Sequence, residues 1–188
     1  MENSSGGNQL LDPQAVLAVS GVKLGSRVAD LGCGAVGHFV FPASQLVGKS
    51  GKVYAVDIRA TVLDGIKRRA HLAGLENIQV LRANLENNKG TGLPDGSADV
   101  AMLINVLFQN DKREEVLREA LRVVKPGGTL LVIDWRSEPS VIGPVAERRV
   151  RSEGVARFCQ AQGAELVKRF EPSKWHFGLL FKKINKPR

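Results

Sequence analysis

The chain has 188 residues, enough for one domain, and its 43% hydrophobic content supports an ordinary buried core. No run of eighteen apolar residues occurs and the polar amino terminus lacks a signal-peptide core, so we expect a cytoplasmic protein without membrane insertion. The formal net charge is +8, and residues 147–188 carry +7 of it through eleven basic and four acidic side chains. Such a basic segment suggests either an anionic partner, which is RNA, an acidic protein or an anionic metabolite, or a solvated surface that keeps the protein in solution.

Hydrophobic periodicity predicts a regular alternation of helices and strands after a flexible amino terminus of residues 1–11. Asp12 is a typical helix N-cap and Pro13 a typical first helical residue, so a short helix is expected to run to about Ser20. Strands are then predicted at Arg27–Leu31, Lys52–Asp57, Ile78–Arg82, Ala98–Ile104 and Thr129–Asp134. Helices are predicted at about His38–Val47, Ala60–Ala73, Asp111–Val124 and Val145–Gln162.

The end of the chain is different, because two strands follow each other without a helix between them. Glu165–Phe170 and Trp175–Lys182 are joined by the short turn Glu171–Lys174, which cannot connect parallel strands. The earlier strands alternate with helices and are rich in apolar residues, which is typical of a parallel sheet covered on both faces. We therefore predict one doubly wound α/β domain over residues 12–188, with a turn at Lys125–Gly128 before the fifth strand.

The segment Val28–Gly37 contains the most informative pattern in the chain. Two apolar residues lead into an acid, and glycines then follow at positions 32, 34 and 37. Such glycines let the backbone turn sharply and let a ligand approach bare N–H groups at a helix start. The spacing Gly32-x-Gly34-x-x-Gly37, with Asp57 twenty residues later, also matches the dinucleotide fingerprint, so an NAD-binding Rossmann enzyme is one alternative.

Two features of the sequence argue against NAD. Asp30 stands at the end of the first strand, where its carboxylate would repel a pyrophosphate and would suit a ligand that carries an amino group. The chain also lacks a separate substrate domain with a His/Arg/Asp set for hydride transfer. Cys33 and Cys159 give no disulfide framework and have no Cys or His at metal-ligand spacing, so we expect reduced thiols and no metal.

Five segments together resemble the class I S-adenosylmethionine-dependent methyltransferases, most of all the small ubiquinone/menaquinone-biosynthesis type. In chain order they are Val28–Gly34, Val53–Asp57, Gly92–Asp99, Leu121–Asp134 and Trp175–Lys182. The resemblance implies a Rossmann-like sheet of seven strands in the order 3-2-1-4-5-7-6, with helices on both faces and an antiparallel last strand. It also implies an enzyme that transfers the methyl group of S-adenosylmethionine to an acceptor and releases S-adenosylhomocysteine.

The same resemblance implies roles for residues of the first two strands. Asp30 would interact with the amino-acid moiety of the cofactor, directly or through water. The backbone of Gly32, Cys33 and Gly34 would pass close under the cofactor's carboxylate and ribose. Asp57 would accept both ribose hydroxyls in a charge-assisted pair, and Ile58 would press on the adenine face.

Further cofactor contacts are implied after the third and fourth strands. Asn84, with Leu85, stands where the family usually has an Asp that reads the adenine amino group, and an Asn keeps a carbonyl acceptor there. Asn105 would line the pocket near the methionine part and the sulfonium. His38 would cover the cofactor. Two residues, Ala35 and Val36, separate the second and third glycines where most relatives have one.

The methyl acceptor is expected over the carboxyl ends of the strands, as in open α/β sheets generally. An antiparallel last strand begins at that edge, so we expect Trp135, Arg136 and Trp175 to line the acceptor site and His176 to be the candidate base. The acceptor itself, a small molecule or a protein, does not follow from the sequence. A non-catalytic cofactor-binding or RNA-binding module is a further alternative, because the last quarter is so basic.

Overall fold

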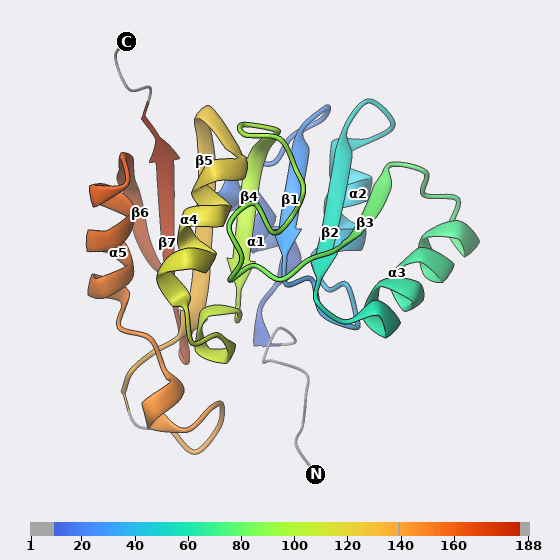
Figure 1. Cartoon of the computed structure of the whole chain (residues 1–188). Coiled ribbons are helices and arrows are strands. Elements are labelled where there is room, and N and C mark those ends of the chain that lie inside the picture. Colours follow the sequence, from blue (N-terminus) through green and yellow to red (C-terminus); the bar gives the residue numbers. More distant parts are fainter. Residues whose placement is uncertain (1–9, 139, 185–188) are drawn as a thin grey trace.

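Seven strands form one sheet in the order β3-β2-β1-β4-β5-β7-β6 (Figure 1). The structure is a computed structural model, and it describes residues 10–138 and 140–184. β7 is antiparallel to both of its neighbours, β5 and β6, whereas the pairs among β1 to β5 are parallel. The predicted fold class and strand order are therefore confirmed. The strands are β1 Arg27–Leu31, β2 Lys52–Asp57, β3 Ile78–Arg82, β4 Ala98–Ile104, β5 Val124–Trp135, β6 Ala164–Ser173 and β7 His176–Lys183.

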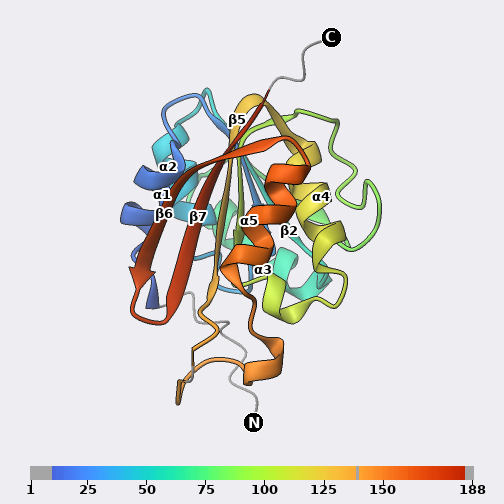
Figure 2. The same ribbon diagram turned by 90° about the vertical axis from the view of Figure 1, so that its left-hand side faces the viewer.

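Helices pack on both faces of this sheet (Figure 2). The helices α1 (Pro13–Ser20), α2 (Val40–Val47) and α3 (Ala60–Leu72) share one hydrophobic cluster with one face of the strands. The helices α4 (Arg113–Val123) and α5 (Ser152–Ala161) share a second cluster with the opposite face. Two short 3-10 helices, η2 and η3, comprise Leu107–Gln109 and Ala146–Arg148.

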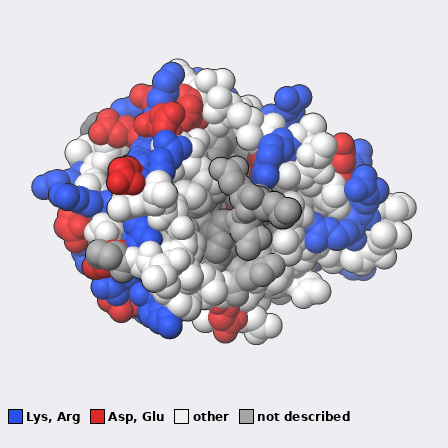
Figure 3. Space-filling model, turned by 90° about the horizontal axis from the view of Figure 1, so that it is seen from below, with Lys and Arg blue, Asp and Glu red and all other residues white. Residues whose placement is uncertain are grey.

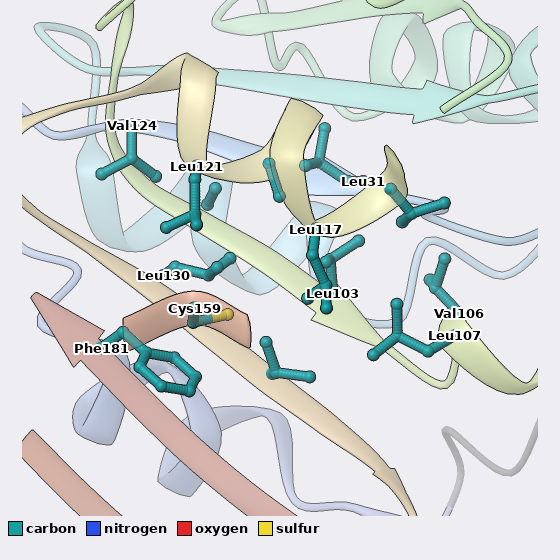
Figure 4. Packing of buried hydrophobic residues seen from close by; sticks show 14 of the residues in the cluster. Leu31, Leu103, Val106, Leu107, Leu117, Leu121, Val124, Leu130, Cys159 and Phe181 are labelled. Carbon is teal, nitrogen blue, oxygen red and sulfur yellow. The ribbon is translucent and has the colours of Figure 1, made fainter. Parts of the chain in front are cut away.

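The central strands are apolar throughout because both of their faces are covered. Along β5, Leu130 and Val132 pack into the α4/α5 cluster, whereas Leu131 and Ile133 pack into the cluster under α1 to α3. Figure 4 shows the α4/α5 side, where Leu117 and Leu121 of α4 and Cys159 of α5 meet Leu103, Leu130 and Phe181 of the sheet. Alternate residues thus serve opposite cores, as expected from the period of two in a strand.

The amino-terminal part of the described chain follows the predicted pattern. The Asp12 side chain accepts a hydrogen bond of 2.9 Å from the Gln14 N–H and so caps α1, and Gly21 ends the helix with a φ of 83°. Leu11, just before the cap, is buried in the α1/α2/α3 cluster. Leu10 is described as well and is exposed, whereas residues 1–9 of the predicted flexible terminus (residues 1–11) lie outside the described part of the chain.

Two predicted boundaries are wrong. Residues 145–162 do not form one helix, because η3 ends at Arg148 and α5 begins only at Ser152. The backbone is extended at Arg149 (φ −67°, ψ 153°), and the Arg149 guanidinium donates to carbonyls of the preceding loop, a tertiary arrangement that a continuous helix would prevent. The predicted turn at 125–128 lies within β5, where the pairing with β4 shifts register between Ala98 and Val100.

The carboxyl end of α4 is capped by a side chain from β7. Lys183 Nζ donates to the carbonyls of Leu121 (2.8 Å) and Val124 (2.7 Å), where helical carbonyls lack partners within the helix. We expect Lys183→Met to lower the free energy of unfolding by about 1–3 kcal/mol, the usual contribution of charge-assisted hydrogen bonds, in urea denaturation. The matched control is Lys182→Met, because Lys182 is exposed. Equal losses in the two variants would rule out the capping role.

Candidate functional site

The carboxyl ends of β1, β2, β4 and β5 meet at one edge of the sheet. In Figure 1 this is the lower edge, and Figure 3 looks straight at it, with Lys and Arg side chains gathered near α3 on one side. Loops at this edge carry the residues that the sequence singled out.

Among residues 10–138 and 140–184, no three His, Cys, Asp or Glu side chains could hold a metal ion together. No described helix has the length and apolar character needed to cross a membrane.

The glycine loop starts where β1 leaves the sheet. The N–H groups of Gly32 and Cys33 both donate to the Val56 carbonyl of β2, at 2.8 and 2.9 Å. Gly32 has a φ of 86°, and a Cβ there would lie 2.5 Å from Cγ2 of Val106. Two causes therefore exclude a side chain at position 32: the left-handed backbone conformation disfavours it, and the Val106 side chain fills the space that it would need. The Cys33 thiol is buried, and burial raises its pKa, so it remains protonated and its role is packing.

Asp30 lies under this loop, only 2% exposed. Its Oδ2 has no hydrogen-bond partner in the described part of the chain. Burial, with a smaller contribution from Asp57, raises the pKa of Asp30 to about 7. A buried acid without a partner is costly in the free protein, and an ammonium group is a chemically suitable partner for it.

Asp57, at the end of β2, faces the same loop and is 6% exposed. Its Oδ2 accepts from the Gly34 N–H at 3.2 Å, and its Oδ1 accepts from the Arg59 N–H at 3.0 Å and from Arg59 Nε at 3.2 Å. No pattern in the sequence indicates that Arg59 folds back onto this carboxylate. Ile58 beside it is 54% exposed, so an apolar surface lies open next to Asp57.

The predicted adenine-reading residues lie in the loop after β3. Asn84 Oδ1 accepts from the Glu86 N–H at 2.9 Å, and the side chain is half-buried. Leu85 is buried in the α4/α5 core cluster, so its side chain supports the loop from within the core. The adenine contacts of both residues remain predictions.

Asn105 occupies a strained position at the end of β4. It has a φ of 57°, a left-handed conformation that is uncommon outside glycine, and it is 2% exposed. Its N–H donates to the Ile133 carbonyl at 2.8 Å, and its own carbonyl accepts from Gln109 Nε2 at 2.6 Å. The strained residue is thus fixed at the edge where a ligand is expected.

Asp134 supports this strained segment, a role that the sequence analysis missed. Its Oδ2 accepts from the N–H of Leu107, the first residue of η2, at 2.9 Å, and its Oδ1 accepts from the Trp135 N–H at 2.8 Å. Burial raises the pKa of Asp134 to about 7 even though backbone N–H groups donate to it. The available signal was an acid ending an apolar strand, as at Asp30 and Asp57.

His38 connects the glycine loop to the residues before α1. Its Nε2 lies 2.9 Å from the Leu11 carbonyl oxygen, and its ring meets Phe39 edge-on at 4.9 Å. The side chain is half-buried. The contact places His38 beside the loop that would hold the cofactor, but contact with a cofactor remains a prediction.

The residues predicted for acceptor binding are divided between core and surface. Arg136 and Trp175 line a cleft of about 280 Å³ together with Glu138, Ser140, Arg149 and Lys174. Trp135 is buried next to His176, with the two ring centres 4.4 Å apart. The cleft is therefore bordered by a charged and aromatic rim.

His176, the candidate base, is fully buried at the start of β7. Its Nδ1 lies 2.7 Å from the Ser173 hydroxyl, and burial lowers its pKa to about 4, so the ring is neutral near pH 7. A base works best when its pKa is near the operating pH. These features favour packing and hydrogen bonding for His176 over proton abstraction.

Comparisons with known proteins show which family the chain belongs to. The sequence profile of a family described as "Methyltransferase domain" matches residues 23–173. The chain is 36% identical over 137 residues to the ubiquinone/menaquinone biosynthesis C-methyltransferase UbiE of Azotobacter vinelandii, which covers 72% of this chain and 52% of that protein. The counterpart of Pseudomonas savastanoi is 35% identical with the same coverage. The chain thus spans about half the length of these curated relatives.

Solved structures show the same fold. A SAM-dependent methyltransferase from Aquifex aeolicus superimposes with a TM-score of 0.84 at 28% identity, covering 97% of this chain and 95% of that chain. A putative type 11 methyltransferase from Sulfolobus solfataricus superimposes with a TM-score of 0.73 at 24% identity, covering 95% of this chain and 96% of that one. The second match concerns the fold alone.

Proposed function

The chain belongs to the methyltransferase-domain family, and from this premise we propose that it transfers the methyl group of S-adenosylmethionine to an acceptor at the carboxyl edge of the sheet. We assign the methyltransferase domain to residues 12–188. The observation that carries the proposal is Asp30, whose buried Oδ2 has no partner among the described residues. The α-ammonium group of the cofactor's methionine moiety would give this oxygen its missing partner.

The other residues of the edge fit the same cofactor. The Asp57 carboxylate would accept the two ribose hydroxyls, and the exposed Ile58 would contact the adenine ring. A Cβ at Gly34 would meet nothing within 4 Å, so the backbone there would be open to the approach of the ligand. Asn105 would line the pocket near the methionine part, held there by its contacts with Ile133 and Gln109.

When bound, S-adenosylmethionine supplies an electrophilic methyl group, and the protein's own contribution is alignment and exclusion of water. Holding two reactants in the right orientation can lower the free energy of activation by about 7–11 kcal/mol. Two sets of hydrogen bonds hold the edge in place for this alignment. The Asp57 carboxylate accepts from the N–H groups of Gly34 and Arg59, and the Asp134 carboxylate accepts from the N–H of Leu107 at the start of η2. The release of S-adenosylhomocysteine would complete the cycle.

The acceptor is proposed to bind at the cleft lined by Arg136 and Trp175. It would be a small molecule or a protein side chain. The curated relatives are named for C-methylation in ubiquinone and menaquinone biosynthesis, so a carbon nucleophile is the first acceptor to test. We further propose a cytoplasmic location, which is supported by two buried cysteines that are free thiols.

The test begins with isothermal titration calorimetry of S-adenosylhomocysteine and NADH against the whole chain. We expect binding of the first and none of the second, because Asp30 would repel a pyrophosphate. A labelled-methyl transfer screen over cell extract, separated into protein, RNA and small-molecule fractions, would then reveal the acceptor. NADH binding would replace the proposal with a Rossmann enzyme. Salt-sensitive RNA binding without methyl transfer would favour a non-catalytic module.

A further inference from the structure

Arg69 of α3 holds the far half of the glycine loop, although the two are more than thirty residues apart in sequence. Its Nη1 donates to the Val36 carbonyl at 2.8 Å, and its Nη2 donates to the Ala35 carbonyl at 2.6 Å. The guanidinium carbon also lies 4.8 Å from the centre of the Phe41 ring of α2. One side chain thus fixes two successive peptide groups and is itself held in place by an aromatic ring.

The glycine that follows is packed against the same helix. Gly37 has a φ of 60°, and a Cβ there would lie 2.5 Å from Cδ1 of Ile66 and 2.9 Å from the Phe41 ring. Its N–H donates to the Gly34 carbonyl at 3.2 Å. The loop between Gly34 and Gly37 therefore has one defined shape, set by α3 on one side and by its own turn on the other.

This shape determines where the loop's N–H groups point. In a planar trans peptide the carbonyl and the following N–H point in opposite directions. Because the Ala35 carbonyl points toward Arg69, the Val36 N–H points away from α3. That N–H has no hydrogen-bond partner within residues 10–138 and 140–184, and Val36 itself is 50% exposed. A backbone N–H whose peptide is fixed by a cation, as the Arg69 guanidinium fixes that of Val36, is suited to bind an anion.

We propose that Arg69 is a positioning residue that orients the Val36 N–H toward the carboxylate of the cofactor's amino-acid moiety. The inference rests on the proposed function. It also assigns a purpose to the two-residue spacing of Ala35 and Val36: the extra peptide gives the Arg69 guanidinium a second carbonyl to hold. Arg69 itself need not touch the cofactor, because it acts through the two loop carbonyls that its Nη1 and Nη2 groups hold, while its Nε donates to the Gly65 carbonyl of its own helix at 3.4 Å.

The test compares two ligands that differ only in the carboxylate. Calorimetry would measure the binding of S-adenosylhomocysteine and of decarboxylated S-adenosylhomocysteine to the whole chain and to Arg69→Met, which keeps the aliphatic stem. We expect Arg69→Met to weaken S-adenosylhomocysteine about tenfold or more and to leave the decarboxylated ligand within about twofold. The matched control is Arg68→Met, because Arg68 is the neighbouring exposed arginine of α3 and its side chain makes no hydrogen bond or ion pair with the described residues. Both affinities should be unchanged in this control.

A second variant guards against misfolding. Arg69→Lys keeps the charge but lacks the planar fork, so it should show a smaller loss with the same selectivity for the carboxylate. Equal weakening of both ligands would mean that Arg69 only stabilises the fold, and unchanged affinity for both would exclude positioning altogether; either result overturns the inference. Failure of the wild-type chain to bind S-adenosylhomocysteine at all would instead contradict the proposed function.

Discussion

Replacement of Asp57 by alanine is expected to weaken S-adenosylhomocysteine binding about 100-fold or more. The carboxylate would lose two charge-assisted hydrogen bonds to the ribose hydroxyls, each worth about 1.5–3 kcal/mol, and every 1.4 kcal/mol is about tenfold in affinity. The Gly34 N–H would also lose its acceptor at 3.2 Å, which loosens the loop beneath the ligand. Isothermal titration calorimetry at pH 8 measures the effect directly.

The control for this experiment is Arg59→Ala. Arg59 binds the same carboxylate in the free protein, with its Nε 3.2 Å from Oδ1, but its side chain is 51% exposed. Removal of Arg59 deletes the ion pair and leaves the acceptor oxygens intact, so affinity should stay the same or rise. Binding by Asp57→Ala within threefold of the wild type would show that ribose is held elsewhere. A large loss in Arg59→Ala would show that the pair, and not the carboxylate alone, binds the ligand.

Asp30→Asn is expected to change stability and binding in opposite directions. The pKa of Asp30 is raised to about 7 in the folded chain, chiefly by burial, from an ordinary value of 3.8. The folded state therefore keeps a proton that the unfolded chain releases between about pH 4 and pH 7. Across that window the free energy of unfolding falls as the pH rises, because the folded state binds more protons. Asparagine avoids this loss.

We therefore expect ligand-free Asp30→Asn to exceed the wild type in stability at pH 8 by up to about 4 kcal/mol, since each unit of pKa difference is worth about 1.4 kcal/mol. The advantage should disappear at pH 4. Urea denaturation at the two pH values measures it. A variant that is less stable than the wild type at pH 8 would show that the carboxylate is satisfied in the free protein by a partner that the described residues do not provide.

Ligand affinity provides the second half of this prediction. The ammonium group of S-adenosylhomocysteine needs an ionised Asp30, so wild-type affinity should fall toward tenfold per pH unit below about pH 7 and level off above it. Asp30→Asn should bind weakly, with no such dependence between pH 5 and pH 8. A pH-independent wild type would remove Asp30 from the ammonium site.

Much of the fold could be predicted from the sequence because its signals are local. The strands at Arg27–Leu31 and Ala98–Ile104 are apolar runs bounded by turn residues, and both begin and end as predicted. The helix predicted over residues 145–162 failed because its interruption depends on Arg149, whose contacts lie in the loop before it. Hydrophobic periodicity does not register such contacts.

The site shows the same division between local and distant causes. Asp30 and Asp57 could be placed because each ends a strand and so must reach the carboxyl edge. Arg69 and Asp134 could not, since their roles lie in contacts with other segments. Arg59 contacts Asp57, only two positions away, but no sequence pattern indicates that its side chain folds back onto that carboxylate. Arg69 reaches across 34 positions to Ala35, and Asp134 reaches across 27 positions to Leu107. From their positions in the sequence alone, these residues cannot be distinguished from ordinary surface charges or from residues that end a strand.

The loop that borders the acceptor cleft owes its shape to one guanidinium. Arg149, 8% exposed, donates to the backbone oxygens of five residues, which are Arg136, Glu138, Ser140, Ile142 and Pro144. Every amino acid has a carbonyl, so the Arg149 contacts place little demand on the side chains of the residues that supply these oxygens. Gly143 is the exception in this loop, because it has a φ of 92° and a Cβ there would lie 2.5 Å from the Trp135 ring. The rim can therefore diverge at the five acceptor positions without losing the contacts of Arg149. A shared cofactor-binding frame could in this way acquire new acceptor preferences over evolution, and a directed-evolution library would best be confined to these positions with Arg149 held constant.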